Sequence, residues 1–187
     1  MNEYVTRYAE KLTYAIRLPA MQDSLQLALW MKDAWKNGNS IYFCGNGGSA
    51  GNAIHLANDF TYGAGKKNGR GIRVEALSAN PAVLTCLAND VGYEAIYSEQ
   101  LKVKANPGDV LVVLSGSGNS PNVVEAIKTG NVLGMRTCAI LGYSGGKCKE
   151  LAHLPIHFAI DDMQIAEDLQ LSVGHICMQW LADQKLD

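Results

Sequence analysis

Apolar residues recur at helical spacing through residues 4–35, a pattern typical of helices that bury one face. Pro19 interrupts this pattern, so the sequence predicts either two helices or one kinked helix. The polar stretch Asn37-Gly38-Asn39 then ends the helical pattern. Residues 1–38 are therefore expected to form an N-terminal helical segment.

Beyond residue 38, short apolar runs alternate with segments of helical spacing. The expected strands are Ile41–Cys44, Arg73–Leu77, Asp109–Leu114, Thr137–Leu141 and Leu154–Ala159, and the expected helices are Ser49–Phe60, Pro81–Ala88, Tyr93–Ala105, Asn119–Leu133, Gly146–Ala152 and Met163–Leu186. Nearly continuous apolar strands that alternate with helices indicate a parallel sheet buried on both faces. Such a sheet has right-handed crossovers, which gives a three-layer, doubly wound α/β fold.

The length of 187 residues suits one domain, with residues 39–187 forming the α/β core. Hydrophobic residues make up 48% of the chain and charged residues 18%, which is a globular composition. The formal net charge of −2 argues against an extended grip on nucleic-acid phosphates. No apolar run is long enough to span a membrane, and the N-terminus is too charged for a signal peptide.

The five cysteines, at positions 44, 86, 138, 148 and 177, are odd in number and widely scattered. Four of them lie in apolar segments. We interpret them as small, reduced core residues of a cytoplasmic protein; disulfides or a thiolate metal site are the alternatives.

Two loops rich in glycine and serine follow expected strands and precede expected helices. They are Gly45–Ser49 and Ser115–Ser120. Glycine allows close approach of a ligand to the backbone, and the helix N-terminus offers unpaired N–H groups and partial positive charge. One such loop alone is also typical of a simple strand–helix turn, but two in one small domain favour a phosphate site.

Neither loop has the sequence of a nucleotide site. The Gly-Lys-Ser/Thr of a P-loop is absent, and neither loop matches GxGxxG with an acidic residue placed for a ribose. The expected ligand is therefore a small phosphorylated compound, with no nucleotide cofactor. His55 and Asp59, one helical turn apart, project from one helix face and could perform proton or metal chemistry on that ligand.

Four longer motifs occur in an order that matches one known family. They are CGNGGSAGNAIHLANDFT, LANDVGYE, PGDVLVVLSGSGNSPNVVEAI and EDLQLSVGHI. With them the chain resembles the sugar isomerase (SIS) domain family, and within it the phosphoheptose isomerases, over nearly its whole length. The resemblance implies a single SIS domain over residues 1–187, a five-stranded parallel sheet between helices, and a homotetramer with active sites between subunits.

The resemblance also implies the residues that contact the phosphorylated sugar. By position these are Asn46, Gly47, Gly48, Ser49, Asp59, Asn89, Asp90, Ser115, Gly116, Ser117, Ser120 and Glu167. The serine-rich loop is expected to take the phosphate group.

An aldose–ketose isomerisation moves a proton between adjacent carbons through an enediol and needs an acid–base pair. The resemblance assigns Asp59 and His175 as catalytic residues. Some family members bind zinc with the equivalents of His55, Asp59, Glu167 and His175, so it also implies a zinc site there. The chain departs from the family pattern at two of these positions, where Asp59 replaces glutamate and Glu167 replaces glutamine. At a further position, Gln170 stands where histidine is frequent.

The implied reaction converts D-sedoheptulose 7-phosphate to D-glycero-D-manno-heptose 7-phosphate, a precursor of lipopolysaccharide or capsule. An isomerase of another sugar phosphate is the nearest alternative. The other alternative is a non-catalytic SIS protein that binds sugar phosphates or regulates, including the type that associates with the bacterial replication initiator. A retained histidine and carboxylate favour the enzyme.

Four further features are expected to be mainly structural. The glycine-rich stretch Gly63–Gly71 is expected to be an exposed, mobile loop, with Lys66, Lys67 and Arg70 either solvated or closing over the sugar phosphate. Asp161 and Asp162 are expected to cap the last helix, with substrate contact as the alternative. His153 and His157 flank the last strand and are interpreted as structural. The apolar set Met163, Leu169, Val173, Ile176 and Trp180 is interpreted as packing or a subunit interface.

Overall fold

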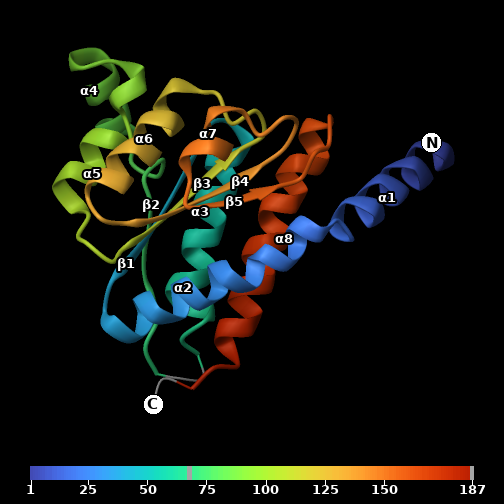
Figure 1. Ribbon diagram of the computed structural model, residues 1–187, viewed down its shortest axis with the longest axis horizontal. Coiled ribbons are helices and arrows are strands. Elements are labelled where there is room, and N and C mark those ends of the chain that lie inside the picture. Colours follow the sequence, from blue (N-terminus) through green and yellow to red (C-terminus); the bar gives the residue numbers. More distant parts are fainter. Residues whose placement is uncertain (67–68, 186–187) are drawn as a thin grey trace.

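The computed structural model describes residues 1–66 and 69–185 (Figure 1). The strands are β1 (Ser40–Gly45), β2 (Arg73–Ala76), β3 (Val110–Ser115), β4 (Arg136–Leu141) and β5 (Leu154–His157). The α-helices are α1 (Asn2–Ile16), α2 (Ser24–Asn37), α3 (Gly48–Asn58), α4 (Pro81–Asp90), α5 (Ser98–Lys104), α6 (Pro121–Val132), α7 (Gly146–Leu151) and α8 (Met163–Ala182). Short 3-10 helices cover Pro19–Asp23 and Tyr93–Ala95, and one π-helical turn, Asp59–Gly63, continues α3.

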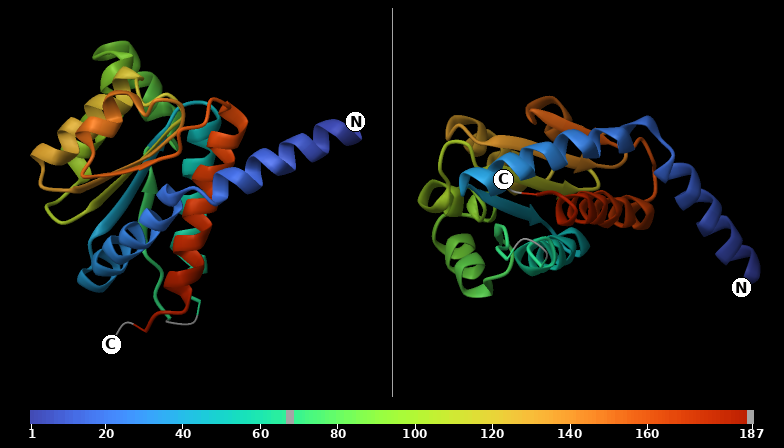
Figure 2. Two further views of the ribbon diagram at one scale, coloured as in Figure 1. Left: turned by 45° about the vertical axis from the view of Figure 1, so that its right-hand side comes forward. Right: turned by 90° about the horizontal axis from the view of Figure 1, so that it is seen from below.

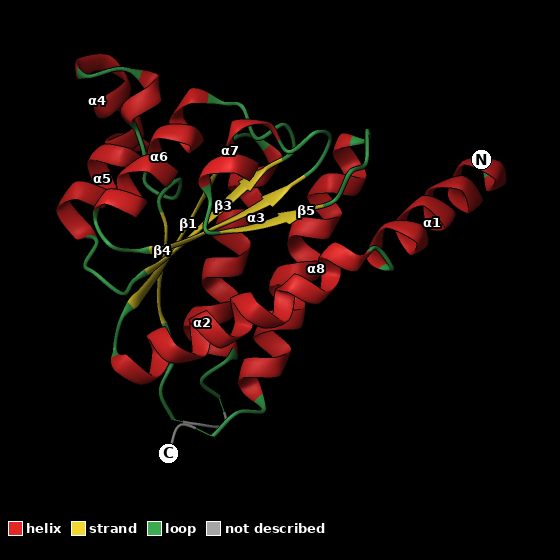
Figure 3. Ribbon diagram, in the orientation of Figure 1, coloured by secondary structure: helices red, strands yellow, loops and turns green. Residues whose placement is uncertain are grey.

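The five strands form one parallel sheet in the order β2-β1-β3-β4-β5 (Figure 3). The chain moves outward from β1 in one direction to β2 and from β3 in the other direction to β4 and β5. Strand order therefore reverses between β1 and β3, the place where doubly wound folds bind their ligands. The predicted α/β architecture and all five predicted strands are confirmed.

Helices cover both faces of the sheet (Figure 2). Side chains of α2, α3 and α8 pack with alternate strand residues in one core cluster, and those of α5, α6 and α7 pack with the other residues in a second cluster. Every residue of β3 is buried. This double burial explains the apolar sequences of the inner strands β1, β3 and β4, whereas the edge strand β2 (RVEA) is partly exposed.

The N-terminal segment divides at Pro19, as expected, and its first helix extends away from the body (Figures 1 and 2). Within α1, Ala15 alone is buried. Two contacts join the helix to α8 and its cap: the Tyr8 hydroxyl donates to Asp168 at 2.5 Å, and the Lys11 amine donates to Asp162 at 2.8 Å. Asp162 is also the N-cap of α8, as predicted, and accepts the N–H of Ile165.

Two helix predictions were wrong in extent. The helix expected over Tyr93–Ala105 is broken between its 3-10 turn and α5, because Ile96 and Tyr97 turn into the core there. The last helix ends at Ala182 and not at residue 186. Residues 186–187 lie outside the described part of the chain.

The prediction of an exposed loop over Gly63–Gly71 was also wrong in part, because Ala64 and Gly65 are buried. The guanidinium of Arg70 donates to the carbonyl of Trp35, and the Trp35 indole donates to the carbonyl of Gly71. These bonds attach the loop to the last turn of α2, near the amino ends of β1 and β2. Arg70 therefore does not close over a site at the carboxyl ends, whereas Lys67 lies outside the described residues.

Four of the five cysteines are buried, Cys86 is exposed, and none forms a disulfide within the described residues. Burial raises the pKa of the Cys148 and Cys177 thiols to about 12, so these groups are inert packing residues. None of the described helices combines the length and apolar composition that a bilayer crossing requires.

Candidate active site

The two glycine- and serine-rich loops lie side by side where strand order reverses. Gly45 at the end of β1 pairs in register with Leu114 of β3, so both loops leave the same edge of the sheet. Together they form a pocket of about 280 Å³, which we call the phosphate pocket after the ligand that its loops predict. Its lining residues are Asn46, Gly47, Gly48, Ser49, Ser115, Gly116, Ser117, Ser120, Met163 and Glu167.

Close packing explains the glycines of the first loop. A Cβ on Gly45 would lie 2.7 Å from the carbonyl oxygen of Leu114 and 2.8 Å from the Cβ of Ser49. Gly47, the N-cap of α3, has a φ of +54°, a conformation that other residues rarely adopt. The loop can therefore turn directly into α3, whose first N–H groups face the pocket edge.

Serine hydroxyls hold the second loop in shape. The Ser115 Oγ accepts the N–H of Gly118 at 3.0 Å, and the Ser117 Oγ accepts the N–H of Asn119 at 3.3 Å. Each hydroxyl accepts through its oxygen and keeps its own hydrogen to donate. The loop can thus present O–H donors to an anion without losing its internal bonds.

The charge distribution of the pocket is unusual for an anion site. Among its described lining residues, Glu167 alone is charged. Its carboxylate lies against the first turn of α3, since a Cβ on Gly48 would lie 2.6 Å from the Glu167 carboxyl carbon. A phosphate in this pocket would be bound by backbone N–H groups, hydroxyls and the N-termini of α3 and α6, without Arg or Lys from the described residues.

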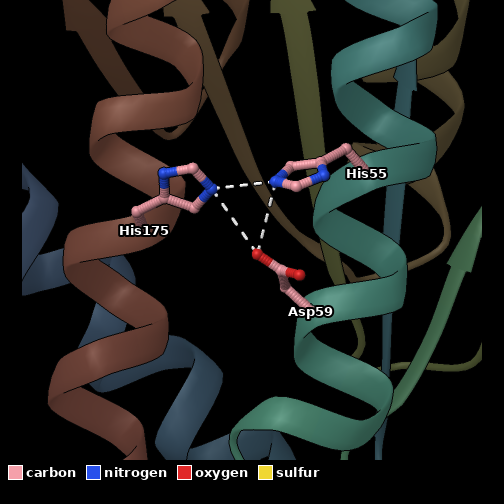
Figure 4. Close-up of side chains that lie close together, drawn as sticks. All are labelled: His55, Asp59 and His175. Carbon is pink, nitrogen blue, oxygen red and sulfur yellow. Dashed lines mark hydrogen bonds and ion pairs between the residues drawn. The ribbon is translucent and has the colours of Figure 1, made fainter.

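Three titratable side chains converge farther along α3 and α8 (Figure 4). The Nε2 atoms of His55 and His175 are 2.9 Å apart. The Asp59 Oδ2 is 3.4 Å from the His55 Nε2 and 3.5 Å from the His175 Nε2. We call these residues the His–Asp–His cluster. Its side chains are partly exposed, at 48% for His55, 22% for Asp59 and 40% for His175.

The His–Asp–His cluster has the donor set of a zinc site, and two of its three interatomic distances match one. Ligand atoms held tetrahedrally at about 2.0–2.2 Å from zinc are about 3.3–3.5 Å apart, close to both distances from the Asp59 oxygen. Two imidazoles and one carboxylate are also a ligand set used by catalytic zinc. The three ligand atoms all lie within 4.8 Å of one another, so the cluster fits a metal ion.

The structure separates residues that the sequence prediction had grouped. Glu167, expected as a fourth metal ligand, lies at the phosphate pocket and outside the His–Asp–His cluster. Asn89 and Asp90, expected to contact substrate, are exposed at the end of α4 and do not line the described pocket. All other predicted contacts of the two loops do line it.

Several residues at the pocket were not predicted from the sequence. Met163, interpreted as packing, lines the pocket. Gln170 is buried and donates to the Ser49 hydroxyl at 3.0 Å while it accepts from Asn52 at 3.0 Å. Tyr93 donates to Asn46 at 3.2 Å. Tyr93 stands in the LANDVGYE motif and Gln170 in the EDLQLSVGHI motif, and these motifs are the sequence signals for the two residues.

His153 and His157 occupy structural positions, in line with their interpretation. His153 forms hydrogen bonds with Thr137 of β4, and His157 bonds to the carbonyl of Tyr143. Tyr143 has a φ of +45°, and its amide donates to Ile160 at 3.0 Å. These bonds hold a strained turn beside the serine-rich loop.

Comparison with known proteins identifies the family. The model of the SIS domain matches residues 4–142. A phosphoheptose isomerase of Akkermansia muciniphila is 41% identical over 154 residues, which cover 82% of this chain and 81% of that protein. Another, from Aliarcobacter butzleri, is 36% identical over 172 residues, covering 91% and 90% of the two chains. The chain belongs to the phosphoheptose isomerases of the SIS domain family.

Structural similarity supports the same assignment. The structure of a phosphoheptose isomerase from Neisseria gonorrhoeae matches with a TM-score of 0.87 at 28% identity, over 96% of this chain and 97% of that chain. The resemblance to the phosphoheptose isomerases that the motifs indicated is thereby confirmed.

Proposed function

We propose that the protein interconverts D-sedoheptulose 7-phosphate and D-glycero-D-manno-heptose 7-phosphate through an enediol. The observation that carries the proposal is the spacing of the phosphate pocket and the His–Asp–His cluster along α3 and α8. His55 follows Ser49 by six positions on α3, a rise of about 9 Å, and His175 follows Glu167 by eight positions on α8, a rise of about 12 Å.

That spacing supports a long sugar chain. In an open-chain heptose 7-phosphate, seven bonds join the phosphorus to C2, which extends to about 8–9 Å at the reach per bond of an extended backbone. A phosphate between the loops would then place C1 and C2 near the cluster. A three-carbon sugar phosphate would be too short for this.

The proposed chemistry uses the two groups that the cluster brings together. Asp59 takes a proton from C1 of the ketose while the C2 carbonyl oxygen gains one, which gives the enediol. Return of a proton to C2 and loss of the C1 hydroxyl proton then leave the aldehyde. His175 would exchange the protons of the two oxygens, and Glu167 would accept hydrogen bonds from sugar hydroxyls nearer the phosphate. The family's glutamate is one methylene longer than Asp59, so Asp59 reaches about 1.5 Å less.

The residues that would hold a zinc ion are His55, Asp59 and His175. When bound there, zinc would supply Lewis-acid polarisation of the sugar carbonyl. The addition or removal of zinc therefore belongs in the test of activity.

We further propose a homotetramer with its active sites between subunits. The partial exposure of the His–Asp–His cluster supports this, because proton transfer at carbon is favoured where water is excluded, and another subunit could cover the cluster. The family assignment supports a place in the supply of lipopolysaccharide or capsule precursors. The unpaired cysteines support a cytoplasmic location.

The test is turnover of sedoheptulose 7-phosphate, followed by product, with zinc and with a chelator. We expect Asp59→Asn and His175→Ala to lower kcat by about a hundredfold or more, since each removes a proton-transfer group. Both variants should keep the thermal stabilisation that the sugar phosphate gives. Asp33→Asn, on the exposed surface, is the matched control and should leave kcat unchanged.

Two results would contradict parts of the proposal. If the wild-type protein is stabilised by the ligand and shows no turnover under either condition, it is a non-catalytic sugar-phosphate-binding protein. If both variants lose ligand stabilisation, Asp59 and His175 bind the ligand, and the catalytic roles given to them are wrong.

A further inference from the structure

Two asparagine side chains join the two loops across the point where strand order reverses. The Asn46 Nδ2 donates to the Asn122 Oδ1 at 2.9 Å, and the Asn122 Nδ2 donates to the Asn46 Oδ1 at 2.8 Å. Asn46 belongs to the first loop, and Asn122 is the second residue of α6, directly after the second loop. The reciprocal pair therefore links structures that lie 76 residues apart in the chain.

Asn122 is buried in the core and does not reach the pocket surface. Its exposure is 0%, and its Oδ1 also accepts the N–H of Val123 at 2.9 Å. Asn122 does not line the phosphate pocket, whereas Asn46 does. A fully buried carboxamide needs its partners, because an unsatisfied buried polar group is costly. Asn122 is therefore held in one orientation by the helix and holds Asn46 in turn.

Two tyrosines complete the arrangement from the other side. The Tyr93 and Tyr97 hydroxyls lie 3.2 Å and 3.4 Å from the Asn46 Oδ1, and the Tyr97 hydroxyl also donates to the carbonyl of Gly45. Tyr97 is buried, with an exposure of 2%. Burial raises the pKa of Tyr97 above its ordinary value, so the hydroxyl stays protonated and remains a donor.

These contacts decide what Asn46 can offer to a ligand. Its Oδ1 accepts from Asn122 and Tyr93, so it does not present an acceptor to the pocket. Its Nδ2 carries two hydrogens, of which one goes to Asn122. The second hydrogen and the backbone N–H groups of the loop are donors, and donors are what a phosphate requires.

We propose that Asn122 is a positioning residue for the phosphate group, with Tyr97 as its support. Asn122 fixes the separation of the N-terminal turns of α3 and α6 and orients the Asn46 carboxamide so that it donates to the ligand. The role of Asn46 as a phosphate ligand rests on the proposed function. The hydrogen bonds by which Asn122 links the two loops do not depend on it. Because the groups act on binding of the phosphate and not on the His–Asp–His cluster, their loss should affect KM and leave kcat nearly unchanged.

The first test replaces Asn122 with aspartate, which has nearly the same shape but only accepts hydrogen bonds. Asn122→Asp removes the donor to Asn46 and places a buried carboxyl group next to the Asn46 side chain. We expect KM for sedoheptulose 7-phosphate to rise at least about tenfold, with kcat within about threefold of wild type. The thermal stabilisation given by inorganic phosphate should be lost as well.

Asn131→Asp is the matched control, since Asn131 also lies on α6 and forms interior hydrogen bonds, to Leu151 and Thr137. It should lower the melting temperature and leave KM and phosphate stabilisation unchanged. If Asn122→Asp and Asn131→Asp behave alike, or if Asn122→Asp keeps the wild-type KM, Asn122 has only a structural role and the proposal fails.

If Asn122→Asp does not fold, two tyrosine-to-phenylalanine variants, which perturb the core less, test the same proposal. Tyr97→Phe removes one hydroxyl and keeps the ring, and we expect KM to rise about two- to tenfold. Tyr42→Phe removes a comparable hydroxyl, which donates to the carbonyl of Lys104, from the same core cluster. It should leave KM unchanged, and equal KM values for the two variants would overturn the proposal.

Phosphate stabilisation also separates this proposal from the proposed function, because it needs no turnover. A wild-type protein that is stabilised by inorganic phosphate but inactive on the sugar would refute the enzyme and leave the positioning role testable. If phosphate stabilises the wild-type protein and the Asn122→Asp variant equally, the positioning role is refuted whatever the activity.

Discussion

Glu167 gives the phosphate pocket a negative charge where an anion is expected to bind. Its carboxylate lies against Gly48 in the first turn of α3, and the other described lining residues are neutral. A helix N-terminus stabilises a carboxylate as it does a phosphate, so the side chain can rest there when no ligand is bound. A phosphate that enters must share the helix terminus with Glu167 and is repelled by it.

Replacement of this carboxylate by an amide should therefore strengthen phosphate binding. We expect Glu167→Gln to lower the dissociation constant of inorganic phosphate about three- to tenfold, because a like charge a few ångströms away is removed. Isothermal titration at low ionic strength measures this directly. The gain should diminish as salt is added, since salt screens the repulsion.

The control for this change is Glu99→Gln on α5, where the carboxylate pairs with Lys102 away from the pocket. It should leave the phosphate constant unchanged. Weaker phosphate binding by Glu167→Gln would show that the carboxylate orders the loop and does not oppose the anion.

At the scale of elements, α1 depends on α8 for its position. The contacts of Tyr8 with Asp168 and of Lys11 with Asp162 are the polar links between them. The hydrogen bond from Lys11 is the main cause that lowers the pKa of Asp162 below its ordinary value. The ionised form of Asp162 therefore favours the folded arrangement.

This link has a defined pH dependence. Because the pKa of Asp162 is lower in the folded protein, its contribution to stability is present above the ordinary carboxyl pKa and is lost as pH falls through the lowered value. We expect Lys11→Met to lower the melting temperature by about 1–2 °C at pH 7, as for an exposed ion pair, and by nothing at a pH where Asp162 is protonated. Melting curves of both proteins across the acid range measure the difference. A difference that stays constant with pH would show that Lys11 acts through packing alone.

The pattern of apolar residues predicted the helices and strands whose positions depend mainly on burial of one or both faces. Apolar runs located β1, β3 and β4, and Pro19 located the break between the first two helices. The break between Tyr93 and Ala105 escaped prediction because no glycine or proline marks it. There the chain bends so that Tyr97 can bond to Gly45, a partner 52 residues away. The sequence pattern around Tyr97 gives no information about a contact with so distant a residue.

The same limit applied to the site. Glycine, serine and helix position were sufficient to predict the two loops, because their chemistry is local. Asn122 lies on a helix whose expected buried positions are apolar, and a polar residue there is ordinarily read as surface. Its partner Asn46 becomes apparent only when β1 and β3 are paired. Glu167 is predicted both to contact the sugar and to bind metal, because helical spacing allows it to face either the pocket or His175; in the structure it lines the pocket.

At the scale of the whole molecule, α1 carries apolar surface that no described part of the same chain covers. Tyr4, Val5 and Tyr14 are 66%, 63% and 65% exposed. A helix of 15 residues is marginal in water without packing, so this surface favours contact with another copy of the chain. That contact would belong to the proposed homotetramer.

Charge placed on this surface should therefore break the assembly. We expect the double variant Tyr4→Glu, Val5→Glu to elute as a smaller species than the wild type, because two carboxylates would have to be desolvated in the contact. Size-exclusion chromatography with light scattering gives the mass. Val132→Glu, at an 87% exposed position on α6, is the control and should keep the wild-type mass. A wild-type protein that is monomeric would contradict both the homotetramer and this contact.

The pocket gathers its walls from the first third, the middle and the last helix of the chain. Gly48 and Glu167, which touch across it, are separated by 119 residues, which a ribosome adds in about 6–24 s. Throughout that interval the nascent protein has its first glycine-rich loop but lacks a complete α8, and for more than the first half of it β3 and Asn122 are also missing. It follows that a growing chain cannot sequester sugar phosphate, and that ligand binding marks the completion of synthesis and folding.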